Sequence, residues 1–116
     1  MQHYAQVISD KRFQYYDYGK DLNEEYYNQD TPPEIPLDNI SDFPVGLFVG
    51  KTDELATVED NEWLRDILDA NGSLGAYNLY GFGHISFYLA KDMSYFTDDV
   101  IPFIKSHIPA AGIVEE

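Results

Sequence analysis

The 116-residue sequence contains no cysteine. This absence excludes a disulfide-stabilised scaffold and a thiolate metal site, and it leaves the redox compartment open. No apolar run approaches the roughly 18 residues that a membrane-spanning helix needs. Residues 1–13 also lack the apolar stretch of a secretory signal. We therefore expect a chain that does not cross a membrane.

Basic residues are scarce. Lys and Arg number 7 against 21 Asp and Glu, so the formal net charge is −14. A surface with this charge repels phosphate groups, which argues against binding nucleic acid or docking on anionic lipid. Hydrophobic residues make up 44% of the chain and aromatic residues 16%. This content allows a core to form, and the length permits one small domain at most.

The composition divides the chain into three segments. Residues 1–44 are polar, rich in tyrosine and marked by prolines, and we interpret them as a connecting segment. Residues 45–110 contain the apolar runs and the helical periodicity that ordered elements require. Residues 111–116 are expected to form a tail.

The segment 45–110 has the pattern of an α/β fold. A continuous apolar run over 45–50 predicts a strand buried on both faces, and a helix is expected over 57–70. A second strand fits 76–80, and the chain is mainly helical from there to about His107. No hairpin turn separates the two strands, so the order strand, helix, strand, helix predicts parallel strands.

Two chemically versatile side chains follow the two expected strands. Asp53 comes just after the first strand and His84 just after the second. Ligands and catalytic groups collect at the carboxyl ends of parallel strands, and an Asp followed by a His fits the last two members of a Ser…Asp…His triad. Simpler interpretations remain open on spacing alone, because an Asp in such a loop often caps a helix and a His beside glycines often lies on the surface.

Several ordered segments carry a family resemblance. They are FQYYDYG at 13–19, YNQ at 27–29, PP at 32–33, GKTDELA at 50–56 and GHISF at 83–87. Through them, residues 3–107 resemble the C-terminal third of the acid (gastric and lysosomal) lipase family, a branch of the α/β-hydrolases.

The resemblance implies a fold and an activity. The fold would be the C-terminal portion of an α/β-hydrolase, with parallel strands and crossover helices in 45–110, preceded by a cap-return segment in 1–44. The activity would be hydrolysis of neutral lipids or other esters through an acyl-enzyme on a serine. Asp53 would orient the imidazole and His84 would act as the general base. The family needs no cofactor or metal ion, and its members are mostly secreted or lysosomal.

The sequence departs from this family at the nucleophile. It contains no G-x-S-x-G elbow, and the nearest candidate, GSLG at 72–75, has the wrong spacing. The oxyanion-hole loop is also absent, and Ser86 stands where the family has an Asp. We therefore expect the chain to be inactive alone. It is either the C-terminal part of a serine ester hydrolase, completed by upstream sequence or by a partner chain, or a non-catalytic remnant that serves as an interaction module.

Overall fold

The computed structural model describes residues 1–109, so the tail expected at 111–116 lies outside the described residues. The chain divides into two compact units, Met1–Leu37 and a second unit from Asp38 onward. A short 3-10 turn, η1 (Leu37–Asn39), covers the boundary. The structure mixes helices with a small parallel sheet, as an α/β fold requires.

The first unit consists of two short helices joined by extended chain. Helix α1 (Gln2–Asp10) and helix α2 (Lys20–Tyr27) each end at a residue in the left-handed conformation. An antiparallel bridge pairs Gln14 with Glu34 and brings the two extended stretches together. None of the hydrophobic residues of this unit is fully buried, so polar contacts must hold much of it together.

Asn23 is the polar centre of the first unit. Its side chain is 1% exposed and forms three hydrogen bonds. The Oδ1 atom accepts from the Tyr18 amide at 3.0 Å, and Nδ2 donates to Asp17 Oδ1 at 2.8 Å and to the Asp30 carbonyl at 2.9 Å. The side chain thus connects the stretch before α2 to the stretch after it.

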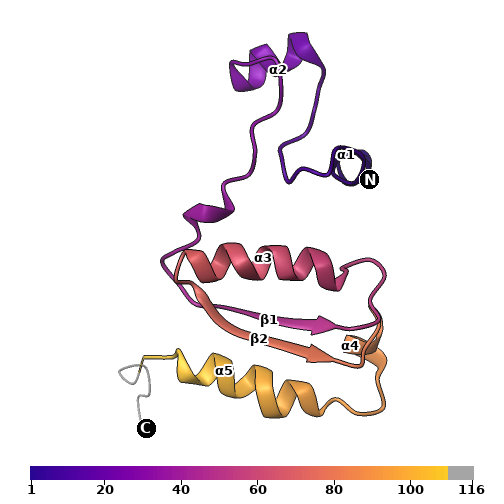
Figure 1. Cartoon of the computed structure of the whole chain (residues 1–116), viewed down its shortest axis with the longest axis vertical. Helices are drawn as coiled ribbons and strands as arrows, with labels where there is room; N and C mark the ends of the chain where they lie inside the picture. Colours follow the sequence, from indigo (N-terminus) through magenta and orange to yellow (C-terminus); the bar gives the residue numbers. More distant parts are fainter. Residues whose placement is uncertain (110–116) are drawn as a thin grey trace, which may run out of the picture. The chain divides into compact units, whose positions relative to one another are not determined.

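The second unit is built on two parallel strands (Figure 1). Strand β1 (Val45–Gly50) pairs with strand β2 (Leu74–Tyr80), which confirms the parallel arrangement expected from the sequence. The register shifts after the first pair, so that Gly75 is an extra residue on β2. With this bulge, β2 begins at Leu74, two residues before the start of the strand expected at 76–80.

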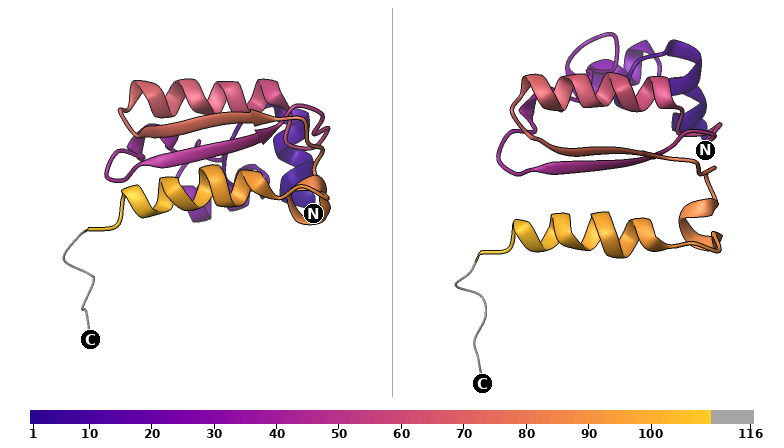
Figure 2. Two further views of the ribbon diagram at one scale, coloured as in Figure 1. Left: turned by 90° about the horizontal axis from the view of Figure 1, so that it is seen from below. Right: turned by 60° about the horizontal axis from the view of Figure 1, so that its bottom comes forward.

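Helix α3 (Val58–Ala70) connects the strands, as expected for a crossover. It begins where the Thr57 side chain accepts a hydrogen bond from the Asp60 amide at 3.3 Å. It ends before Gly72, which has a φ of 74° that favours glycine. Helix α3 covers one face of the sheet, and the C-terminal helix α5 (Ile101–Ser106) lies on the other (Figures 1 and 2).

The region after β2 is divided into three helical pieces rather than one. These are α4 (Ser86–Leu89), a π-helical turn η2 (Phe96–Val100) and α5 (Ile101–Ser106). Pro102 lies in the first turn of α5, and because it has no N–H, the α-helical hydrogen-bond ladder is interrupted there. The wider π turn precedes it, with the Ile101 amide bonded to the Phe96 carbonyl.

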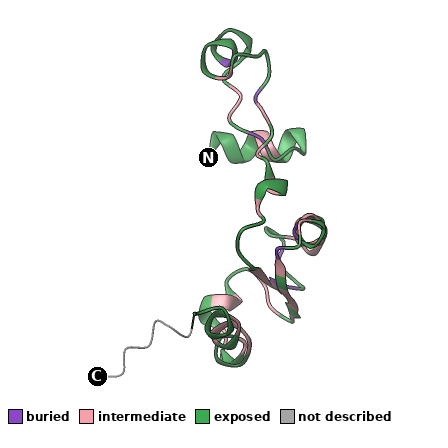
Figure 3. Ribbon diagram, turned by 90° about the vertical axis from the view of Figure 1, so that its left-hand side faces the viewer, coloured by how far each residue is buried: buried purple, intermediate pink, exposed green. Residues whose placement is uncertain are grey.

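The described core is small, and it corrects one expectation. Only Val49 and Leu68 are buried hydrophobic residues, at 4% and 1% exposure, and most of the chain is half-buried or exposed (Figure 3). Strand β1 was expected to be buried on both faces, yet its residues 45–48 are only half-buried. The reason is that the sheet has two strands within residues 1–109, so each strand pairs on one side only there.

Candidate active site

Asp53 lies in the turn after β1, where its own chain holds the carboxylate. The Oδ1 atom accepts hydrogen bonds from the Leu55 and Ala56 amides, both at 2.9 Å. The side chain is 5% exposed. The pKa of Asp53 is lowered, chiefly by the Ala56 hydrogen bond and further by those from Leu55 and His84, while burial acts in the opposite direction. The carboxylate is therefore ionised at neutral pH and can only accept hydrogen bonds.

His84 follows β2 and contacts this carboxylate. Its Nδ1 atom lies 3.0 Å from Asp53 Oδ2, although the two residues are 31 positions apart in the sequence. Because the carboxylate accepts, Nδ1 must carry the proton, and Nε2 of the neutral ring keeps its lone pair. The imidazole side chain is 49% exposed, and Nε2 forms no hydrogen bond within residues 1–109. The arrangement leaves an oriented imidazole on a half-exposed side chain.

A compact turn holds His84 in place. The Gly83 amide donates to Ser86 Oγ at 3.1 Å, and the Ser86 amide donates to the Gly83 carbonyl at 3.1 Å. Ser86 stands where the resembling family has an Asp, and here its hydroxyl closes the turn around His84. A serine can do so because its short side chain bonds readily to nearby backbone.

The structure thus brings both sequence-predicted site residues together at the carboxyl ends of β1 and β2. The Leu55 and Ala56 amides were not identified from the sequence. The sequence did contain a signal for them: an Asp side chain often accepts hydrogen bonds from amides two and three residues later, as in an Asx turn, and Leu55 and Ala56 stand at these positions after Asp53. The pair has the geometry of an imidazole oriented by a carboxylate.

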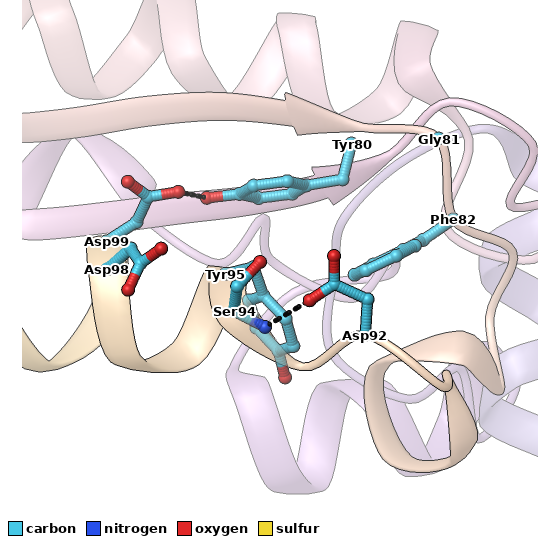
Figure 4. Close-up of a pocket in the computed structure, with 8 residues that line it drawn as sticks. All are labelled: Tyr80, Gly81, Phe82, Asp92, Ser94, Tyr95, Asp98 and Asp99. Carbon is cyan, nitrogen blue, oxygen red and sulfur yellow. Dashed lines mark hydrogen bonds between the residues drawn. The ribbon is translucent and has the colours of Figure 1, made fainter.

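An open hollow of about 330 Å³ lies at the end of β2 (Figure 4). The Tyr80 hydroxyl donates to Asp99 Oδ2 at 2.5 Å within it. Burial of the phenol, and then this hydrogen bond, raise the pKa of Tyr80 to about 12. The residues lining the hollow are Tyr80, Gly81, Phe82, Asp92, Ser94, Tyr95, Asp98 and Asp99.

Residues 1–109 contain neither a metal-binding cluster nor a helix that could span a membrane. No three His, Asp or Glu side chains converge there on a point that could hold a metal ion. No helix in this part of the chain has the length and apolar character to cross a bilayer.

Two curated proteins are similar to the chain. A tear acid lipase-like protein from Mesocricetus auratus is 30% identical over 106 residues, which is 88% of this chain and 25% of that protein. Triacylglycerol lipase 2 from Arabidopsis thaliana is 38% identical over 68 residues, which is 57% of this chain and 16% of that protein. No protein-family model and no solved structure gives a significant match. The chain is therefore related to the lipase family, over a quarter or less of the length of these relatives.

Proposed function

We propose that the chain is the C-terminal part of a lipase-like serine ester hydrolase of the α/β-hydrolase type. The observation that carries this proposal is the hydrogen bond between Asp53 and His84 at the carboxyl ends of two neighbouring parallel strands. It leaves the Nε2 atom of a half-exposed ring with a lone pair and no hydrogen-bond partner within residues 1–109. The relationship to two proteins named as lipases supplies the reaction class.

In this reaction His84 would transfer protons and Asp53 would orient its ring. As a serine hydroxyl attacks the ester carbonyl, His84 takes its proton on Nε2, and it then gives the proton to the departing alcohol. Asp53 keeps the ring in the Nδ1–H tautomer and stabilises the imidazolium that forms. The acyl-enzyme is hydrolysed when His84 takes a proton from water and returns it to the serine oxygen.

The serine is the missing member. The 116 residues contain no G-x-S-x-G elbow, and removal of the nucleophile from a triad leaves only residual activity. We propose that the serine is supplied by upstream sequence of the same protein or by a partner chain that completes the sheet. The substrates would be neutral lipids or other carboxylic esters, with no cofactor.

The first test uses the native protein in its source material. We would determine its intact mass and treat it with a fluorophosphonate, which reacts with activated serines. The proposal predicts either a mass well above 13.3 kDa with a labelled serine, or a labelled companion chain bound to this one. A 13.3 kDa species with neither labelled serine nor labelled companion would refute it.

A second test assigns the base. In the completed enzyme, His84→Ala should lower ester hydrolysis by three or more orders of magnitude, since triad members act as a unit. His107→Ala is the matched control, because His107 is exposed and its ring bonds only within its own helical turn. Full activity of the His84→Ala enzyme would show that the pair has another purpose.

One observation favours a second candidate function, a non-catalytic interaction module. The outer edges of β1 and β2 have no strand beside them within residues 1–109, and such edges recruit other chains. This candidate predicts a stable complex with a partner that lacks a labelled serine. His84→Ala would leave that complex intact, which distinguishes assembly from catalysis.

A further inference from the structure

Gly50, the last residue of β1, faces the loop that carries His84. It is buried, and a Cβ atom added to it would lie less than 3.0 Å from the Phe82 carbonyl oxygen, closer than real Cβ atoms approach. The same Cβ atom would be 3.1 Å from the Phe82 carbonyl carbon. The obstacle is backbone, which cannot rotate away as a flexible side chain can. Any larger residue at this position must therefore displace the loop.

This close approach extends the strand pairing into the two loops. The Lys51 amide donates to the Tyr80 carbonyl at 2.8 Å, and the Thr52 amide donates to the Phe82 carbonyl at 3.1 Å. In the second of these bonds, Thr52 immediately precedes Asp53 and Phe82 stands two residues before His84. The distance between the two loops is thus fixed by the backbone just before it reaches the pair.

The other glycines of this loop do not share the constraint. A Cβ atom on Gly81 would meet nothing within 4 Å, and one on Gly83 would come no closer than 3.7 Å to the Thr52 carbonyl oxygen. Gly50 also has no positive φ that would require glycine for conformational reasons. What position 50 needs is therefore space for the Phe82 carbonyl.

We propose that Gly50 is a positioning residue for the Asp53–His84 pair, acting through the space that it leaves for the Phe82 carbonyl. Its catalytic meaning rests on the proposed function. In Gly50→Ala, restoring ordinary contact distances would move the His84 loop by about 1 Å. The distance between His84 Nδ1 and Asp53 Oδ2, which is 3.0 Å in the structure, would then grow beyond the hydrogen-bond range. A misplacement of about 1 Å lowers an enzyme's rate by about 100-fold, so the completed enzyme should lose activity to that extent.

The test measures the pair directly by NMR on the full 116-residue chain. In the wild type, the ring ¹⁵N shifts of His84 should report the Nδ1–H tautomer, because Asp53 accepts that proton. Gly50→Ala should reduce or reverse this preference while the amide spectrum shows that the chain is folded. Gly81→Ala is the matched control and should keep the wild-type tautomer. If Gly50→Ala also keeps it, the proposal is wrong.

A wild-type measurement tests the proposal even where Gly50→Ala does not fold. The hydrogen bond from Thr52 to Phe82 should give a scalar coupling between the Thr52 nitrogen and the Phe82 carbonyl carbon. If that coupling is absent, the loops do not approach as described and Gly50 has nothing to accommodate. Neither measurement needs the serine. The two proposals can also fail separately. If Gly50→Ala loses the Nδ1–H tautomer but the completed His84→Ala enzyme is fully active, Gly50 still positions the pair and the proposed function is wrong.

Discussion

Replacing Asn23 with alanine should destabilise the first unit strongly. The substitution removes three hydrogen bonds of 2.8 to 3.0 Å from a side chain that is 1% exposed. It also leaves the Tyr18 amide and the Asp30 carbonyl without these partners. At about 1 kcal/mol for each bond, the free energy of unfolding of Met1–Leu37 should fall by about 3 kcal/mol. A unit this small has little stability to lose, so the variant should unfold there substantially.

The assay is native-state hydrogen exchange, which resolves the two units. The Asn28 amide, bonded to the Glu24 carbonyl at 3.0 Å, reports α2. Trp63 lies in the second unit, so its fluorescence during urea denaturation reports that unit alone. Gln29→Ala is the control, because its one hydrogen bond is exposed and its loss should cost less than about 0.5 kcal/mol. An equally small loss in Asn23→Ala would refute the reasoning.

Three further predictions concern the second unit. Leu68→Ala should lower the free energy of unfolding by roughly 2 to 5 kcal/mol, measured by urea denaturation at Trp63, and a loss below about 1 kcal/mol would contradict burial at this site. The pKa of Asp53 is lowered from its ordinary value of 3.8, chiefly by the hydrogen bond from the Ala56 amide. The ionised carboxylate therefore stabilises the folded state above pH 3.8, and this stabilisation is lost as the pH falls. The stability advantage of the wild type over Asp53→Asn should therefore shrink as the pH falls below about 5 and through the lowered pKa of the folded state. The pKa of Tyr80 is raised from 10.0 to about 12, so the stability from its protonated phenol is present below pH 10 and is lost as the pH rises through 12. Tyr80→Phe should remove one group titrating near pH 12 in the ultraviolet absorbance.

The elements that the sequence predicted well are those with local signals. The apolar run over 45–50 became β1, and the apolar periodicity between Thr57 and Gly72 became α3, with the cap and the stop at those two residues. The parallel pairing followed from the order of elements. The same order predicted that Asp53 and His84 would reach one edge of the sheet, where the structure brings them together. Their catalytic role stays a prediction.

The features that the sequence did not reveal depend on distant partners. Helix α2 is rich in charged residues and has no side-chain cap, and its buried Asn23 is bonded to residues outside the helix. The steric demand at Gly50 arises from Phe82, which is 32 positions away along the chain. The half-burial of β1 follows from the two-stranded sheet, in which each strand pairs on one side only within residues 1–109. Local patterns cannot encode any of these conditions.

The parallel pairing of β1 and β2 has a consequence for folding kinetics. Parallel neighbours cannot be joined by a tight turn, so Val45 meets Leu74 only after the whole of α3 has been placed across the sheet. Such non-local contacts carry a loop-closure cost before any of them forms, and they slow the search for the native state. The contact between Asp53 and His84 spans 31 residues and lies beyond the last pair of the ladder. The Asp53–His84 hydrogen bond should therefore be among the last contacts to form as the chain folds, and the imidazole of a nascent chain would not yet be held in one tautomer.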